Sequence, residues 1–250
     1  MTNQPVPLPS QQDEINDRVN GLSKARQGAA AIFSLPPKDI ATLSLEEPGS
    51  ELFRDVARTT LPIEFNGEEI HLEAHAYEDD TASYQAMALV HRGAAHKGEI
   101  PLVRVHSGCV TGDIFHSLRC DCYAQLQLSL KVIVSSQLGI VIYLPHHEGR
   151  GIGLVNKIKA YAEQDRGLDT VDANLSIGAP IDARDYQLPA KILKDLGYCK
   201  IKLMTNNPLK VEALVNQGIE VAEQCQTVTE PSEHNQRYLD TKRKRMSHNL

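Results

Sequence analysis

The stretch Arg104–Gln125, with the sequence RVHSGCVTGDIFHSLRCDCYAQ, decides how the rest of the chain is interpreted. It holds three of the five cysteines, Cys109, Cys120 and Cys122, and no further Cys or His at a conventional ligand spacing. Structural zinc sites usually have four protein ligands, whereas catalytic zinc sites leave one position for water or substrate. The pattern therefore predicts a zinc ion that takes part in chemistry.

Composition and charge exclude several classes of protein. The 250 residues carry a formal net charge of -6 with both signs interspersed, which argues against a nucleic-acid or membrane partner. The one basic run, Lys242–Arg245, is interpreted as a solvated tail. The sequence shows neither a signal peptide nor an apolar run of about 18 residues, so we expect a cytoplasmic protein. Five cysteines fit a reducing compartment, and Cys199 and Cys225 are predicted to be buried free thiols.

Three segments are predicted along the chain. Residues 1–58 form an N-terminal extension, partly disordered and then helical where apolar residues recur between Ile15 and Ala29. Residues 59–230 form the catalytic domain, and residues 231–250 form a C-terminal tail.

Alternation of polar and apolar residues predicts an antiparallel sheet at the start of the catalytic domain. Leu61–Phe65 and Ile70–Ala76 alternate on either side of the turn Asn66-Gly67, which is typical of a β-hairpin. Further strands are predicted at Tyr84–His91 and Ile100–Val105. We expect this antiparallel sheet to present the start of the cysteine stretch at its end.

A glycine-rich loop follows in the middle of the chain. A helix is predicted at about Ala124–Ser136, then the strand Ile140–Leu144, the loop Pro145–Gly153 and a helix at about Leu154–Asp165. Three glycines at alternate positions let backbone N–H groups approach an anion beside a helix N-terminus. Such a loop alone is a weak indication of phosphate binding. Of its two adjacent histidines, we expect one to line a pocket and the other to pack or be solvated.

The last third has the pattern of a βαβ unit. Strand Ile201–Met204, helix Pro208–Asn216 and strand Ile219–Val221 follow one another. Ligands favour the carboxyl ends of strands in such units, which places Thr205 and Lys210 to hold a phosphate or a polar ring edge. The predicted fold class is mixed α/β (α+β), with an N-terminal antiparallel or barrel-like part and a C-terminal βαβ part.

Three polar residues have two interpretations when taken alone. Tyr161 lies near the apolar face of its predicted helix, where a tyrosine either packs or takes part in catalysis. Asp182 and Arg184 share one side of an extended segment, and a surface ion pair would produce the same pattern as an acid and base in a site.

Taken in order, these pieces resemble one family, GTP cyclohydrolase II, which carries out the first step of riboflavin biosynthesis. The resemblance covers about Leu61–Met246 through the motifs RVHSGCVTGD, SLRCDC, EGRGIGLVNKIKAYAEQDRGLDTVDAN, DARDY, LMTNNPLK and YLDTK. It implies a zinc-dependent hydrolase that opens the imidazole ring of GTP and releases formate and pyrophosphate. The product would be 2,5-diamino-6-ribosylamino-pyrimidinone 5'-phosphate. The resemblance also implies one Zn²⁺ per subunit, Mg²⁺ bound with the triphosphate, and a homodimer.

The resemblance assigns roles to individual residues. Cys109, Cys120 and Cys122 match zinc ligands, Asp182 a proton acceptor, Arg184 a nucleophile toward the α-phosphate, and Tyr161 a tyrosine needed for turnover. The positions that match nucleotide contacts are Arg104, Val105, His106, Ser107, Gln125, Glu148, Gly149, Arg150, Thr170, Thr205 and Lys210. Because a guanidinium has a pKa above about 12 and offers only donors, Arg184 has an alternative role as an electrostatic clamp.

Two places depart from the family pattern. Gly108 stands where the family usually has Glu, and Pro145–His147 is one residue longer than the usual loop and lacks its basic side chain. Three hypotheses follow: a GTP cyclohydrolase II, a paralogue that acts on another nucleotide or in pyrimidine catabolism, and a catalytically silent nucleotide-binding protein. The retained cysteines and catalytic residues favour the first, and the two departures favour the second.

Overall fold

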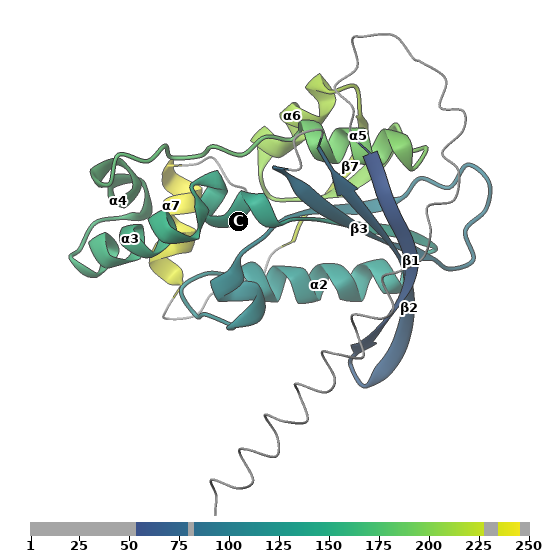
Figure 1. Ribbon diagram of the computed structural model, residues 1–250, viewed down its shortest axis with the longest axis horizontal. Coiled ribbons are helices and arrows are strands. Elements are labelled where there is room, and N and C mark those ends of the chain that lie inside the picture. Colours follow the sequence, from purple (N-terminus) through teal and green to yellow (C-terminus); the bar gives the residue numbers. More distant parts are fainter. Residues whose placement is uncertain (1–53, 80–82, 228–234, 246–250) are drawn as a thin grey trace, which may run out of the picture. The chain divides into compact units, whose positions relative to one another are not determined.

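Seven strands form one mixed sheet in the described part of the chain, which comprises residues 54–79, 83–227 and 235–245 of the computed structural model (Figure 1). The strands are β1 (Arg54–Phe65), β2 (Glu68–Glu78), β3 (Gln85–Arg92), β4 (Leu102–Ser107), β5 (Leu138–Leu144), β6 (Lys200–Met204) and β7 (Glu220–Cys225). Their order across the sheet is β1-β2-β3-β5-β4-β6-β7. The helix predicted between Ile15 and Ala29 lies outside the described residues.

The sheet has an antiparallel half and a parallel half. The predicted hairpin is confirmed, with Asn66 and Gly67 both at positive φ in the turn between β1 and β2. Strands β1, β2, β3 and β5 pair antiparallel, whereas β4 lies parallel to both β5 and β6, and β6 lies parallel to β7. The mixed α/β class is therefore confirmed, and the two parts expected from the sequence are halves of one sheet.

The expectation that an antiparallel sheet delivers the cysteine stretch is wrong for β4. This strand is followed by the helix α2 (Cys122–Val134) before the chain returns in β5. A long connection through a helix is what joins parallel neighbours, whereas a tight turn joins antiparallel ones. The apolar pattern of a strand does not reveal the direction of its partner.

The helices cover both faces of the sheet. Those after α2 are α3 (Gly153–Asp165), α4 (Thr170–Ser176), α5 (Gln187–Asp195), α6 (Pro208–Asn216) and α7 (Gln236–Arg245), with short helical turns η1 (Val110–Ile114) and η2 (Pro145–Gly151). The predicted helices that correspond to α2, α3 and α6 are confirmed. In Figure 1, α2 lies on one face of the sheet and α5 and α6 lie on the other.

Strand β5 shows why both faces need cover. Ile140, Ile142 and Leu144 pack with α5 and α6 in the larger apolar cluster, whereas Val141 packs with Ile133 of α2. Because side chains alternate between faces, a strand buried on both sides has a continuous apolar sequence. Arg104 and His106 of β4 alternate with the core residues Val103 and Val105, so they point away from α5 and α6.

Two predictions about outlying residues are corrected. The basic run Lys242–Arg245 belongs to α7, and Arg245 forms ion pairs with Asp169 and Asp172 at the start of α4. Cys199 is exposed and Cys225 is half-buried, because Cys199 precedes β6 in a turn and β7 is an edge strand. No helix within the described ranges is long and apolar enough to cross a membrane.

Candidate active site

One edge of the sheet gathers the predicted site residues. The parallel strands β4, β5 and β6 end there, and each continues into a loop that lines a single pocket. Most residues with a predicted role line it: Arg104, His106, Ser107, Cys109, Cys120, Cys122, Gln125, Gly149, Arg150, Tyr161, Thr170, Arg184, Thr205 and Lys210. Segments far apart in the sequence thus meet at one place.

Three predicted residues are not among those that line the pocket. Val105 belongs to the apolar core, and its carbonyl accepts a hydrogen bond from Lys210 Nζ at 2.8 Å. Glu148 is buried, and its carboxylate accepts hydrogen bonds from Val110 N at 2.6 Å and Gly149 N at 3.1 Å. Asp182 binds Arg184. Each of the three thus contacts a residue that lines the pocket: Lys210, Gly149 and Arg184 respectively.

The three cysteines meet in a geometry that suits a metal ion. Their sulfurs lie within 4.8 Å of one another, and Cys109 Sγ is 3.7 Å from Cys120 Sγ. Tetrahedral zinc with Zn–S bonds of about 2.3 Å separates its sulfurs by roughly 3.8 Å, so this spacing fits. A Cβ on Gly112 would lie 3.0 Å from both of these sulfurs and 3.0 Å from Cys122 Cβ. Glycine therefore keeps the space between the cysteines open.

The thiols are electrostatically coupled. Hydrogen bonds shared with Cys120 and Cys122 and the ammonium of Lys157 lower the pKa of Cys109 far below its usual range. The hydrogen bond to Cys109 raises the pKa of Cys120 to about 11, and the same sharing raises the pKa of Cys122. Binding of a metal to three thiolates would therefore release protons from the latter two.

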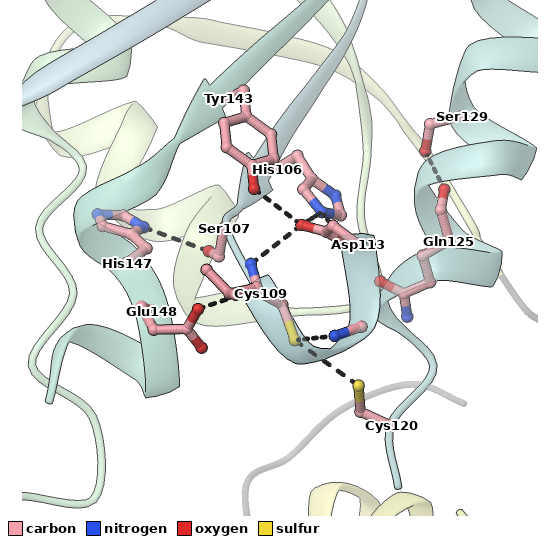
Figure 2. Close-up of polar contacts among 12 residues, drawn as sticks. His106, Ser107, Cys109, Asp113, Cys120, Gln125, Ser129, Tyr143, His147 and Glu148 are labelled. Carbon is pink, nitrogen blue, oxygen red and sulfur yellow. Dashed lines mark hydrogen bonds and ion pairs between the residues drawn. The ribbon is translucent and has the colours of Figure 1, made fainter. Parts of the chain in front are cut away.

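A buried carboxylate anchors the turn that starts at Cys109. Asp113 accepts hydrogen bonds from Cys109 N at 2.9 Å, Tyr143 Oη at 3.0 Å and His106 Nε2 at 3.1 Å (Figure 2). Burial lowers the pKa of His106, which indicates a neutral ring that donates its Nε2–H to the carboxylate. His106 thereby orients Asp113, and Asp113 orients the first cysteine.

A series of hydrogen-bonded side chains anchors the other two cysteines. Arg104 donates to Gln125 Oε1 at 2.6 Å, and Gln125 Nε2 donates to Asp121 Oδ2 at 2.6 Å. Asp121 is buried between Cys120 and Cys122. Arg104 also donates to Met204 O at 3.1 Å, so this series ties the cysteine pair to the end of β6.

Asp182 and Arg184 form an ion pair at the border of the pocket, which Arg184 lines. Arg184 donates through Nε at 2.9 Å and through its second terminal nitrogen at 2.5 Å to the two carboxylate oxygens. Their side chains are only 28% and 10% exposed, which differs from the surface pair considered from the sequence. Burial acts to raise the pKa of Asp182, but the hydrogen bond and charge of Arg184 hold it below its ordinary value. The acid is thus ionised at neutral pH.

The glycine-rich loop brings cationic groups to the same pocket. Gly149, Arg150 and Gly151 all have positive φ, and a Cβ on Gly151 would lie 2.9 Å from the carbonyl of Ala183. This close approach needs glycine and sets Arg150 beside the Asp182 segment. Of the two histidines, His147 is buried and lines the pocket, whereas His146 packs against Tyr84, as expected.

The two departures from the family pattern touch each other. A Cβ on Gly108 would lie 3.0 Å from Leu144 O, 3.1 Å from Pro145 Cα and 3.2 Å from Tyr143 Oη. The end of β5 together with Pro145 therefore occupies the space that a larger residue at position 108 would need. His147, two residues further along, accepts or donates a hydrogen bond with Ser107 Oγ at 3.2 Å.

Among the residues without a predicted role, three contact or position the cysteines. Asp113 and Asp121 position the cysteines, and Lys157 lies 3.0 Å from Cys109 Sγ. Asp121 stands between two predicted ligands, and Lys157 precedes Tyr161 by one helical turn. Their positions in the sequence could therefore have indicated that both residues lie near the site. Nothing in the sequence shows that the lysine side chain turns inward.

Three cysteines around an open space, in a pocket that Arg184 and further cations line and Asp182 borders, form an arrangement suited to an enzyme site. A sequence profile of the family GTP cyclohydrolase II matches residues 54–226, which is most of the chain. The chain therefore belongs to the GTP cyclohydrolase II family.

Individual relatives agree with this assignment. The GTP cyclohydrolase-2 of Streptomyces coelicolor is 50% identical over 177 residues, which cover 71% of this chain and 79% of that protein. The GTP cyclohydrolase-2 of Archaeoglobus fulgidus is 40% identical over 97% of this chain and 61% of its own length. The riboflavin biosynthesis protein RibBA of Aquifex aeolicus is 48% identical, and this chain spans only 43% of its length.

Proposed function

We propose that this protein is a GTP cyclohydrolase II that opens the imidazole ring of GTP and releases formate and pyrophosphate. The product would be 2,5-diamino-6-ribosylamino-pyrimidinone 5'-phosphate, the first intermediate of riboflavin biosynthesis. The observation that carries this proposal is that the three cysteines and the Asp182–Arg184 pair line or border one pocket. Ring opening and phosphate chemistry on one nucleotide require that arrangement.

The cysteine end of the pocket suits the ring-opening step. Cys109, Cys120 and Cys122 would hold Zn²⁺, which when bound supplies the Lewis acidity that hydrolysis at C8 of a guanine needs. Tyr161 lines the pocket from α3, with the guanidinium of Arg119 4.8 Å from its ring centroid. This position supports a role for the phenol in holding or moving a proton near the opening ring.

The cationic residues of the pocket suit the triphosphate. Arg150 and Lys210 line the pocket and would neutralise phosphate oxygens, with Mg²⁺ arriving on the nucleotide. The α-phosphate would meet Arg184, whose guanidinium is held in place by two hydrogen bonds to Asp182. An arginine offers no lone pair while charged, so either Asp182 takes its proton or Arg184 acts as a clamp on the transferring group.

A second function is favoured by one observation. Gly108 and Pro145 are in contact where the family usually has Glu and a basic loop, so the pocket differs beside Ser107. A paralogue that hydrolyses another nucleotide would use the same cysteines and the same Asp182–Arg184 pair. A silent nucleotide-binding protein would have no need to retain all of them.

The assembly and location proposed for this enzyme follow the family resemblance. We infer a homodimer in the cytoplasm, without a nucleic-acid or membrane partner. Light scattering of the purified protein tests the first of these: a mass of about twice the 27.6 kDa of the chain supports it, and a monomer contradicts it.

The test of the function is a product assay with several nucleotides. Zinc-loaded protein is incubated with GTP and Mg²⁺, and formate, pyrophosphate and the pyrimidinone absorbance are followed. All three products from GTP support the first function. Turnover of ATP or UTP but not GTP would establish the second, and no turnover of any nucleotide would leave only a binding role.

A further inference from the structure

We propose that Lys157 is a positioning residue of the metal centre, which holds Cys109 through a hydrogen bond from its ammonium to the thiolate. This inference rests on the proposed metal site of Cys109, Cys120 and Cys122. Lys157 has no role in the nucleotide contacts or catalytic set that the family resemblance supplies.

The geometry around Lys157 is unusual for a lysine. Its side chain is 9% exposed, and Nζ lies 3.0 Å from Cys109 Sγ and 2.5 Å from Glu148 Oε1. Lysine is rarely buried to this extent unless it is paired. Because its partner Glu148 is a buried carboxylate, Nζ is an ammonium group held between two acceptors.

Glu148 joins this contact to the backbone of the metal turn. Its second oxygen accepts the hydrogen bond from Val110 N, one residue after Cys109. The lysine and the glutamate thus hold the first cysteine from two sides, at the sulfur and at the following peptide. Both come from the η2–α3 segment, so they connect the cysteines to the helix that carries Tyr161.

A hydrogen-bond donor of this kind stabilises the negative charge of a metal-bound thiolate. Three thiolates outweigh the charge of one divalent ion, and a charge-assisted N–H···S hydrogen bond draws electron density from the sulfur. Gly112 N also donates to Cys109 Sγ, at 3.3 Å. Residues that orient metal ligands in this way typically change metal affinity or activity by about 10–100-fold when they are replaced.

A plainer role is that Lys157 only neutralises the buried Glu148. Lys157→Met alone cannot separate the two roles, because it leaves an unpaired carboxylate in the interior, which is strongly destabilising. The double variant Lys157→Met/Glu148→Gln removes that carboxylate charge and keeps an amide oxygen for Val110 N. Lys159→Met is the matched control, since Lys159 lies on the same helix and is exposed.

The experiment measures metal affinity by chelator competition, and the thiolate-to-metal absorption band of the Co²⁺-loaded proteins. We expect the single and the double variant to bind metal about 10–100-fold more weakly, with a shifted band, while Lys159→Met matches the wild type. Recovery of wild-type affinity and band by the double variant would overturn the inference, because Lys157 would then serve Glu148 alone. Wild-type protein that binds no metal would overturn the proposed metal centre, and this inference with it.

Discussion

The substitution Gly112→Ala tests the metal site through a single methyl group. The new Cβ would lie 3.0 Å from Cys109 Sγ, 3.0 Å from Cys120 Sγ and 3.0 Å from Cys122 Cβ. Gly112 is not at positive φ, so alanine introduces no backbone strain. The methyl group acts only by crowding the three cysteines.

The size of the effect follows from that crowding. Atoms in ordinary contact are about 3.5–4.0 Å apart, so the new methyl group and the cysteines must move apart by a few tenths of an ångström. Overpacking of this kind costs about 1–3 kcal/mol. If that cost falls on the metal-bound state, it weakens metal binding by roughly 5–150-fold, since each 1.4 kcal/mol is about tenfold.

The assay is zinc content and zinc affinity of purified Gly112→Ala protein, with Gly93→Ala as the control. Gly93 also lacks a positive φ, and its Cβ would lie 3.2 Å from Ser136 O, far along the chain from the cysteines. We expect Gly112→Ala to lose zinc and Gly93→Ala to keep it. Wild-type zinc affinity in folded Gly112→Ala would refute the assignment of this space to a metal.

Three further predictions concern the rest of the pocket. Gly108→Glu is expected to destabilise the protein by about 1–3 kcal/mol in urea unfolding and not to raise GTP turnover, because Pro145 and Leu144 O occupy the space; higher turnover would show that the glycine is the main departure. Asp182→Asn is expected to lower product formation by about 10²–10⁴-fold with zinc content unchanged, and loss of zinc in that variant would place the effect at the cysteines instead. Burial lowers the pKa of His147 to about 3, whereas the pKa of histidine in the unfolded chain is about 6.5. The free energy of unfolding should therefore be highest above pH 6.5 and fall by about 1.4 kcal/mol per pH unit at lower pH, because only the unfolded chain takes up the proton. His147→Gln should reduce this slope between pH 6 and 4, and an unchanged slope would assign it to other groups.

Local pattern predicted the parts of the fold that local interactions decide. The turn Asn66-Gly67, the helix after Cys122 and the βαβ unit at the end of the chain all follow from residue spacing, and all are present. The predicted antiparallel pairing of β4 was wrong, because the direction of a strand relative to its partner depends on the whole connection that follows it. The helix α5, with Ala190, Ile192 and Leu193 buried, had no predicted counterpart.

For the site, too, the sequence predicted some features, whereas others depend on the tertiary structure. Cysteine spacing predicted which residues would meet, and the three sulfurs do lie together. The anchors of those cysteines depend on side-chain directions that one sequence does not contain: Asp113 of the turn η1 meets Tyr143 of β5, and Lys157 turns inward from α3. The contact between Gly108 and Pro145 likewise joins two departures that are far apart in the sequence.

The central claim is most directly tested with GTP that carries ¹³C at C8. NMR of the reaction with zinc-loaded protein and Mg²⁺ should show labelled formate, with pyrophosphate released in equal amount, and Cys120→Ser should form no labelled formate. Pyrophosphate and GMP without labelled formate, or labelled formate from zinc-free Cys120→Ser protein, would contradict the account.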